Sequence, residues 1–208
     1  MKRFNFKDQI VFENENYIAI NKPAGVSSLH ERLGIANSVI EQAKNHGENL
    51  QLCHRLDKET SGVLLLSKHA AAYSHAAVSF EKRRVTKTYH AVADGAHKFE
   101  HFEVNLPLIT TRSGRSAVSK QKGKPSTTFF TTIQNFKHHS LIACEPVTGR
   151  QHQIRIHLAS QNAPISADEI YGGKMPFLSR FKKNFTTNKT QEETPMINRF
   201  ALHAYSLS

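Results

Sequence analysis

The chain has 208 residues, of which 38% are hydrophobic, so it can form one substantial core or two small ones. Lysine and arginine number 28 against 17 acidic residues, and the resulting net charge of +11 indicates an anionic partner, with nucleic acid as the first candidate. The sequence contains no run of 18 apolar residues and no basic amphipathic helix, which argues against a membrane partner.

Two further features bear on the cellular compartment. The N-terminus is basic but has no apolar core segment, so no signal peptide is expected. The only cysteines, Cys53 and Cys144, lie in apolar, strand-like surroundings. A reducing, cytoplasmic location is therefore expected.

The first fifty residues predict short elements of both kinds. Residues 10–20 give two β-type runs around a polar turn. Residues 21–26, with sequence NKPAGV, break the second strand, because proline removes a donor and glycine permits unusual dihedral angles. Residues 37–46 are expected to form an amphipathic helix, and residues 50–53 lead into a polar loop.

That loop, residues 54–62, has the sequence HRLDKETSG and precedes a short apolar run. The length of the run and its bounding turn favour a strand, although a short apolar run alone does not exclude a helix. A loop of this kind can present Asp57 at the end of a buried strand, as scaffolds often present catalytic groups. Alternatively, an ion pair of Asp57 with Arg55 or Lys58 closes an ordinary surface turn.

The middle of the chain predicts a helix and then mostly strands. Residues 69–83 are rich in alanine and end in basic residues, which favours a helix. Residues 85–93 predict a strand that Asp94 and Gly95 end. Residues 127–133 and 140–145 predict a hairpin joined through residues 135–139.

Two basic segments interrupt this pattern. Residues 110–124 contain no acidic residue and are expected to form a mobile loop, either a solvated connection or an RNA contact. Residues 180–189 form a second basic, polar stretch. Neither segment marks a clean boundary, so residues 1–208 are predicted to form a single domain. The cations of the first segment are Arg112, Arg115, Lys120, Lys122 and Lys124.

Residues 147–159, VTGRQHQIRIHLA, contain a Thr-Gly turn and then an apolar helix face. Arg150, His152 and Arg155 concentrate donors near the start of that helix, which suits a phosphate or a carboxylate. A metal site is not expected, because His152 and His157 are five residues apart and no Cys-x-x-Cys or His-Glu-x-x-His is present. The Gly-x-Ser-x-Gly elbow of hydrolases and a P-loop are also missing from the sequence.

Taken together, these segments resemble the RluA-type pseudouridine synthase family. The family pattern reads HRLDxxTSG, then Lys or Arg-x-Tyr, then TGRxHQIRxHL, and this chain has the three motifs at residues 54–62, 87–89 and 148–158. The match extends to residues 21–25, 165–172 and 202–204 in the family's order. The resemblance therefore covers nearly the whole chain.

The resemblance implies an α+β fold with a bent, mostly antiparallel mixed sheet flanked by helices and crossed by a catalytic cleft. It implies conversion of uridine to pseudouridine in structured RNA, ribosomal or transfer, without a metal or an organic cofactor. By motif position, Asp57 is the catalytic carboxylate, Arg155 its ion-pair partner, and Tyr89 packs on the target base. Arg55 fills the gap left by the extruded nucleotide. Further RNA contacts are expected from His54, Thr60, Arg150 and His152.

The chemistry agrees with these roles. A target base must leave the stack to reach an active-site pocket. A neighbouring guanidinium favours an ionised carboxylate against desolvation. Whether the reaction uses a covalent sugar adduct or removes a ribose proton is open. The alternative function is a catalytically silent RNA-binding or RNA-folding factor, but such a protein has no need to desolvate Asp57 beside a polyanion.

The chain departs from the family pattern in several places. Residues 164–168 read PISAD where the family usually has PILGD, and loss of that glycine can alter a turn. No S4 RNA-binding module is expected before residue 21, and the chain stops at Ser208, short of the usual final strand residues. The RNA contacts are then expected to come from the catalytic domain and its basic loops, and the protein is expected to be a monomer.

Overall fold

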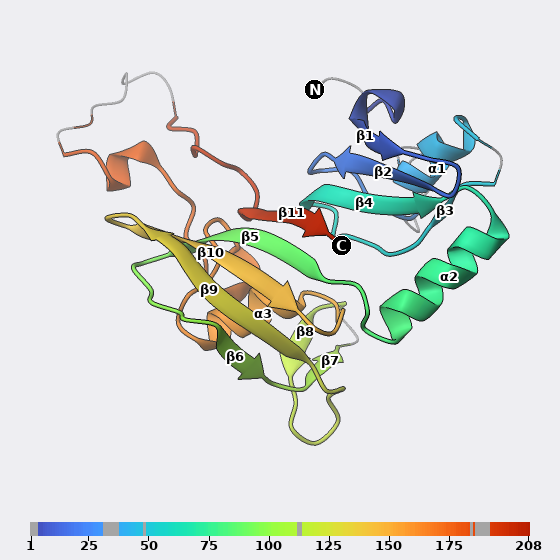
Figure 1. The fold of residues 1–208 in the computed structure, drawn as a ribbon. Coiled ribbons are helices and arrows are strands. Elements are labelled where there is room, and N and C mark those ends of the chain that lie inside the picture. Colours follow the sequence, from blue (N-terminus) through green and yellow to red (C-terminus); the bar gives the residue numbers. More distant parts are fainter. Residues whose placement is uncertain (1–3, 31–37, 48, 112–113, 184, 186–191) are drawn as a thin grey trace. The chain divides into compact units, whose positions relative to one another are not determined.

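The computed structural model describes residues 4–30, 38–47, 49–111, 114–183, 185 and 192–208 (Figure 1). The chain folds into two compact units. The first consists of Met1–Tyr89 with His203–Ser208, and the second of His90–Leu202. In the described part of the chain, no helix is both long enough and apolar enough to cross a membrane.

The sheet of the first unit is built around β4 (Ser61–Ser67), which pairs antiparallel with β2 (Tyr17–Lys22) and parallel with β11 (Leu202–Leu207). On the far side of β2 lies β1 (Ile10–Glu13), and the short β3 (Gln51–Leu52) also pairs with β4. The apolar run after the polar loop is therefore a strand, as predicted. Gly62 has a φ of +111°, and a Cβ there would overlap the carbonyl of Ala204 on β11, so only glycine fits.

The core of this unit contains Ile18, Ile20, Leu64 and Leu66, all almost completely buried. Helix α1 (Val39–Lys44) begins where the hydroxyl of Ser38 accepts a hydrogen bond from Glu41 N–H, and it is shorter than the predicted 37–46. Helix α2 (Ala70–Glu81) confirms the helix predicted over residues 69–83. A short 3₁₀ helix, η1 (Lys7–Gln9), precedes β1.

The second unit contains the hairpin of β9 (Thr127–Asn135) and β10 (His139–Pro146), which confirms the predicted pairing. β5 (Lys87–Asp94) neighbours β10, and β6 (Phe102–Asn105) pairs antiparallel with β9. Helix α3 (Gln153–Ser160) contacts β9 and β10 and contributes the fully buried Leu158. Two 3₁₀ helices follow, η2 (Glu169–Tyr171) and η3 (Leu178–Arg180). Mostly antiparallel strands with one parallel pair and few helices make an α+β fold, as predicted.

Residues 116–118 correct the expectation of a loop over residues 110–124. β7 (Leu108–Thr110) and β8 (Ser116–Val118) form a two-stranded antiparallel hairpin, and a further bridge joins Leu108 to Lys124. Leu108 and Ser116 are buried. Three-residue strands show too little alternation to be recognised from sequence. Arg112 lies outside the described residues, as do residues 184 and 186–189 of the second basic stretch.

Ala167 stands where the family pattern has glycine, and its φ is +63°. The turn forms with alanine, because Ser166 N–H donates to Val92 O and Asp168 N–H donates to Ile165 O. The left-handed conformation costs a residue with a Cβ about 1–2 kcal/mol. The departure from the pattern therefore leaves the turn in place, with local strain.

Replacing Ala167 with glycine should relieve that strain. Ala91 on β5 is a matched control, because it is also buried and its φ is not positive. Ala91→Gly should lower the free energy of unfolding by about 1–2 kcal/mol through the lost methyl group and the added chain entropy. In urea unfolding, the change in the free energy of unfolding caused by Ala167→Gly should be more favourable than that caused by Ala91→Gly by about 1–2 kcal/mol. Equal losses in the two variants would contradict strain at Ala167.

Candidate active site

The loop that carries Asp57 is held by the side chain of Ser28. The Ser28 hydroxyl donates to Leu56 O at 2.9 Å and accepts from Leu56 N–H at 3.1 Å, so both backbone groups of the buried Leu56 are satisfied. Thr60 N–H donates to Asp57 O at 3.0 Å and closes the turn. Asp57 is half-buried, and Arg55 on the other side of Leu56 is exposed. The loop thus presents the side chains of Arg55 and Asp57 from a fixed backbone.

A buried lysine joins this loop to the NKPAG segment. Lys22, at the end of β2, is fully buried, and its ammonium group donates to the carbonyls of Pro23 at 2.9 Å, Val26 at 2.8 Å and Lys58 at 3.0 Å. Gly25 N–H donates to the same Lys58 carbonyl at 3.0 Å. Burial of a charge is costly without such partners. The sequence predicted this segment as the end of a strand and as part of the family pattern, but it did not predict that Lys22 binds the Asp57 loop.

His54 attaches the start of the loop to β4. Its Nε2 accepts a hydrogen bond from Leu65 N–H at 3.1 Å, and its ring lies 5.2 Å from the ring of Phe80. Burial lowers the pKa of His54 to about 4, and the positive charge of Lys87 acts in the same direction. The imidazole is therefore neutral at neutral pH, as its acceptor role requires.

Tyr89 belongs to the same unit as Asp57 and packs against its hydrophobic core. Burial raises the pKa of the Tyr89 hydroxyl above its usual range, and the negative charge of Asp57 raises it further. The phenol thus remains protonated at neutral pH. Close to Asp57, Thr60 is buried, and the Ser61 hydroxyl lies 2.9 Å from Nδ1 of His203.

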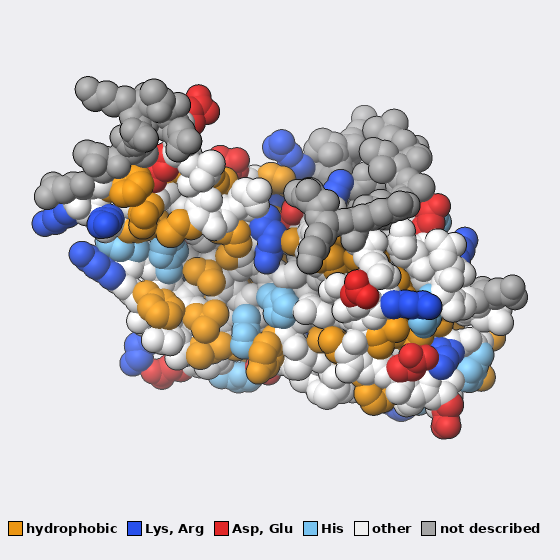
Figure 2. All heavy atoms as spheres, turned by 90° about the horizontal axis from the view of Figure 1, so that it is seen from above, with side chains coloured by type: hydrophobic (Ala, Val, Ile, Leu, Met, Phe, Trp, Pro, Cys, Tyr) orange, Lys and Arg blue, Asp and Glu red, His pale blue; other side chains and the backbone are white. Residues whose placement is uncertain are grey.

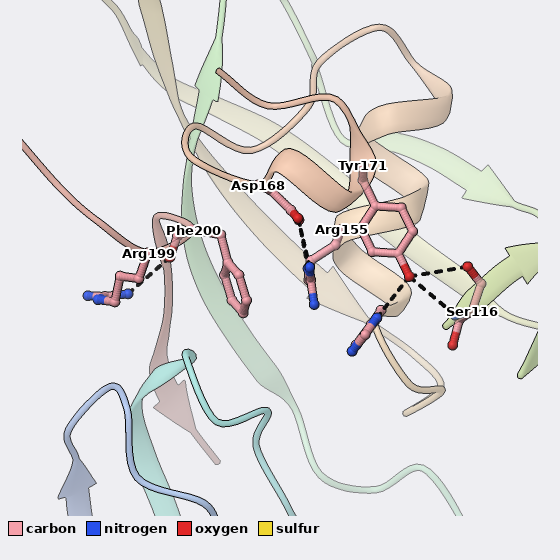
Figure 3. Close-up of polar contacts among 7 residues, drawn as sticks. Ser116, Arg155, Asp168, Tyr171, Arg199 and Phe200 are labelled. Carbon is pink, nitrogen blue, oxygen red and sulfur yellow. Dashed lines mark hydrogen bonds and ion pairs between the residues drawn. The ribbon is translucent and has the colours of Figure 1, made fainter. Parts of the chain in front are cut away.

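In the second unit, Arg155 forms a buried, bidentate ion pair with Asp168 (Figure 3). Arg155 Nε donates to Oδ2 at 2.6 Å and Nη2 donates to Oδ1 at 2.7 Å. The guanidinium carbon lies 4.8 Å from the ring centroid of Tyr171 and 4.1 Å from that of Phe200. Two aromatic faces and a bidentate carboxylate fix the plane of the guanidinium.

The hydroxyl of Tyr171 connects this pair to the β7–β8 hairpin (Figure 3). It accepts from Ser116 N–H at 3.3 Å, lies 3.1 Å from Ser116 O as a donor, and is 2.8 Å from Nδ1 of His152. His152, with a φ of +54°, precedes α3. Gln151 Nε2 donates to Gly114 O at 2.9 Å, which ties the hairpin to the same helix start.

The predicted site residues fall into both units. Asp57, Tyr89, Arg55, His54 and Thr60 belong to the first, and Arg155, Arg150 and His152 to the second. Asp168 and Tyr171 are the partners of Arg155 that sequence reasoning did not assign, although both lie in the segment matching the family pattern. The remaining predicted RNA-contact residues that the structure describes are all exposed: Arg115, Lys120, Lys122 and Lys124.

Fold and motif-bearing loops together define a pseudouridine synthase scaffold. A sequence model of the family described as RNA pseudouridylate synthase matches residues 16–160, across both units. The chain belongs to this family.

Similar proteins agree with this assignment. The chain is 34% identical to the ribosomal large subunit pseudouridine synthase C of Vibrio vulnificus, over 81% of this chain and 54% of that protein. It is also 34% identical to the Escherichia coli protein of the same name, over 96% of this chain and 61% of that protein. The chain thus spans little more than half the length of these curated relatives.

Solved structures show the same fold. The human RNA pseudouridylate synthase domain containing 1 is 25% identical with a TM-score of 0.72, and the match covers all of this chain and 80% of that one. The human RNA pseudouridylate synthase domain containing 4 is 23% identical with a TM-score of 0.70, and the match covers 97% of this chain and 84% of that one. At this identity the likeness shows the fold alone.

Lys22→Met keeps most of the volume of the side chain but removes the donor of three hydrogen bonds. The Lys58 carbonyl keeps its bond from Gly25 N–H, but the carbonyls of Pro23 and Val26 lose the Lys22 donor. Because each carbonyl left without its partner costs about 1–3 kcal/mol, the free energy of unfolding should fall by about 2 kcal/mol or more. Lys44→Met, on an exposed position of α1, is the control and should change stability by less than about 0.5 kcal/mol. A loss as small as that of the control would show that Lys22 does not hold the Asp57 loop.

Tyr171→Phe keeps the ring over Arg155 and removes the hydroxyl that binds Ser116 and His152. Amide hydrogen exchange of residues 116–118 should become faster, with a local loss of about 1–3 kcal/mol. Tyr73→Phe, at an exposed position of α2, should leave exchange unchanged. If exchange of β8 is also unchanged in Tyr171→Phe, the hydroxyl does not anchor the hairpin.

Proposed function

We propose that this chain is an RNA pseudouridine synthase that isomerises uridine in ribosomal RNA, with transfer RNA as the other substrate class to test. The observation that carries the proposal is the Asp57 loop. Its backbone is fixed by Ser28 and Lys22, and its carboxylate interacts electrostatically with the half-buried, protonated Tyr89. Membership of the RNA pseudouridylate synthase family supports it.

In the proposed reaction, Asp57 acts as a carboxylate at the sugar of the target nucleotide. The bond between the sugar and N1 of uracil breaks, a bond from the sugar to C5 forms, and the proton of C5 leaves while N1 gains one. The reaction involves no net oxidation or reduction, so we propose that it proceeds without metal or organic cofactor. Both the covalent-adduct route and the ribose-deprotonation route use the same carboxylate.

Arg155 is proposed as the ion-pair partner of Asp57. The bonds from Nε and Nη2 to Asp168 fix the orientation of the guanidinium. A guanidinium held in this way would stabilise the ionised carboxylate after water has left the site. Tyr89 is proposed to pack on the base, because it combines a flat apolar face with a hydroxyl.

We propose that exposed cations bind the RNA backbone. Arg55 would occupy the space of the extruded uridine, next to the catalytic carboxylate. The hairpin cations would contact phosphates, which position the RNA without reading its sequence. His54, Thr60, Arg150 and His152 are also proposed to contact the RNA, and Arg112 belongs to the proposal although it lies outside the described residues.

The names of the curated relatives support ribosomal RNA of the large subunit as the substrate class. We further propose that residues 1–208 act as one catalytic domain, as a monomer in the cytoplasm. The family match across both units supports the single functional domain.

Asp57→Asn should abolish pseudouridine formation, because it keeps the size of the side chain and removes its charge. RNA affinity should stay equal or rise, since a negative charge is lost beside a polyanion. Pseudouridine would be mapped in ribosomal RNA from a deletion strain after incubation with the wild-type protein, with Asp57→Asn, and with Asp8→Asn as an exposed control.

Turnover near the wild-type rate in Asp57→Asn would contradict the catalytic role. If the wild-type protein binds the RNA but forms no pseudouridine in ribosomal or transfer RNA, the chain is instead a silent RNA-binding factor.

A further inference from the structure

A pocket of about 260 Å³ lies in the second unit, where three segments distant in sequence meet. Its walls come from the end of β5, the β9–β10 turn and the segment around η3. Neither Arg155 nor Asp168 nor Tyr171 lines it. The lining includes Asp94, His138, His139, Lys174, Arg180 and Phe181.

The floor of the pocket is held by hydrogen bonds. Asp94 Oδ2 accepts from Lys174 N–H at 2.7 Å, and Oδ1 lies 3.6 Å from Nε2 of His139. Gly95 N–H donates to His138 O at 2.8 Å, which fixes the β9–β10 turn against the end of β5. The Asp94 carboxylate is thus held by the backbone amide of Lys174, which joins the end of β5 to the segment before η3.

Aromatic rings form one wall. The ring of Phe181 lies 5.4 Å from the ring of His138 and 5.1 Å from that of His139, tilted to both. His138 is exposed and Phe181 is half-buried, so the rings are accessible from solvent. Phe136 in the same turn is 51% exposed. Such a wall offers flat faces on which a base can stack.

The rim is basic. Toward the left of Figure 2, histidine side chains lie among hydrophobic ones, with lysine and arginine side chains around them. Glu193 is an acidic group near Arg180, and it accepts a hydrogen bond from Ser179 N–H at 2.8 Å. The exposed cations of the lining and of the adjoining segments are Lys137, Lys174, Arg180, Lys182 and Lys183.

We propose that this pocket binds a nucleotide of the RNA substrate other than the uridine that is isomerised. The base stacks on the rings of His138 and Phe181, and its phosphate lies against Lys174 and Arg180. Aromatic platforms beside cations are the features with which proteins hold single-stranded RNA. The pocket is slightly smaller than the 300 Å³ or so at which pockets for drug-sized ligands begin, which suits one nucleotide. The inference rests on the proposed function for the identity of the partner as RNA.

The test compares two polyanions, a labelled single-stranded 12-nucleotide oligouridylate and inorganic polyphosphate, which has charge but no bases. Phe181→Leu and His138→Gln should each weaken oligouridylate binding by about 5- to 150-fold and leave polyphosphate binding unchanged. The double variant Lys174→Gln/Arg180→Gln should weaken both, and flatten the slope of log affinity against log salt by up to about 1.4 units. Lys44→Gln/Lys98→Gln removes two exposed cations elsewhere and serves as the control.

His138 accepts the backbone hydrogen bond from Gly95 N–H through its carbonyl, so His138→Gln leaves this bond in place and tests the ring even if Phe181→Leu fails to fold. Equal losses for both polyanions in the ring variants, or oligouridylate affinity like that of the control, would overturn the proposal. Tighter binding of polyglutamate than of oligouridylate would also overturn it, in favour of an acidic protein partner. The measurement needs no turnover, so a wild-type protein that forms no pseudouridine would refute the proposed function and leave this result standing.

Discussion

The buried ammonium group of Lys22 is the interaction on which the candidate active site most depends. It satisfies three carbonyls, those of Pro23 and Val26 in residues 21–26 and that of Lys58, the residue after Asp57. Loops usually keep their carbonyls in water, because buried backbone groups must be paired. Here a single side chain with three donors replaces that water, so two loops can approach closely without regular secondary structure between them.

The second unit uses a buried ion in a related way. Arg155 and Asp168 are both nearly inaccessible, and their pairing is favourable only because the geometry is bidentate and two rings cover the guanidinium. A residue with positive φ lies just before each of the two segments that contain Arg155 and Asp168. His152 precedes α3, and Ala167 precedes Asp168. Strain of this kind persists where surrounding bonds over-determine the backbone, as the contacts of Tyr171 and Ser166 do here.

Much of the scaffold could be predicted from sequence because its signals are local. The alanine-rich α2, the apolar β4 after a Thr-Ser-Gly turn, and the β9–β10 hairpin each carry their pattern within a few residues. The motif positions of Asp57, Tyr89 and Arg155 came from resemblance to a family. The partners of these residues were not predictable in the same way. Backbone carbonyls, which bind Lys22, have no signature in sequence. The bond of Arg155 to Asp168 depends on a turn in which Ala167 has a positive φ, a conformation that alanine rarely adopts.

The His54 anchor adds a dependence on pH to this architecture. Its Nε2 can accept from Leu65 N–H only while the ring is neutral, and burial lowers the pKa to about 4 from an ordinary value near 6.5. Between those two values the unfolded chain takes up a proton that the folded chain excludes. Stability contributed by the anchor is therefore fully present above pH 6.5 and declines as the pH falls toward 4. The pKa of Tyr89 is shifted upward instead of downward, and this keeps the phenol neutral well into the alkaline range. Around neutral pH both neighbours of the Asp57 loop are thus uncharged, so neither places a charge of its own beside the Asp57 carboxylate.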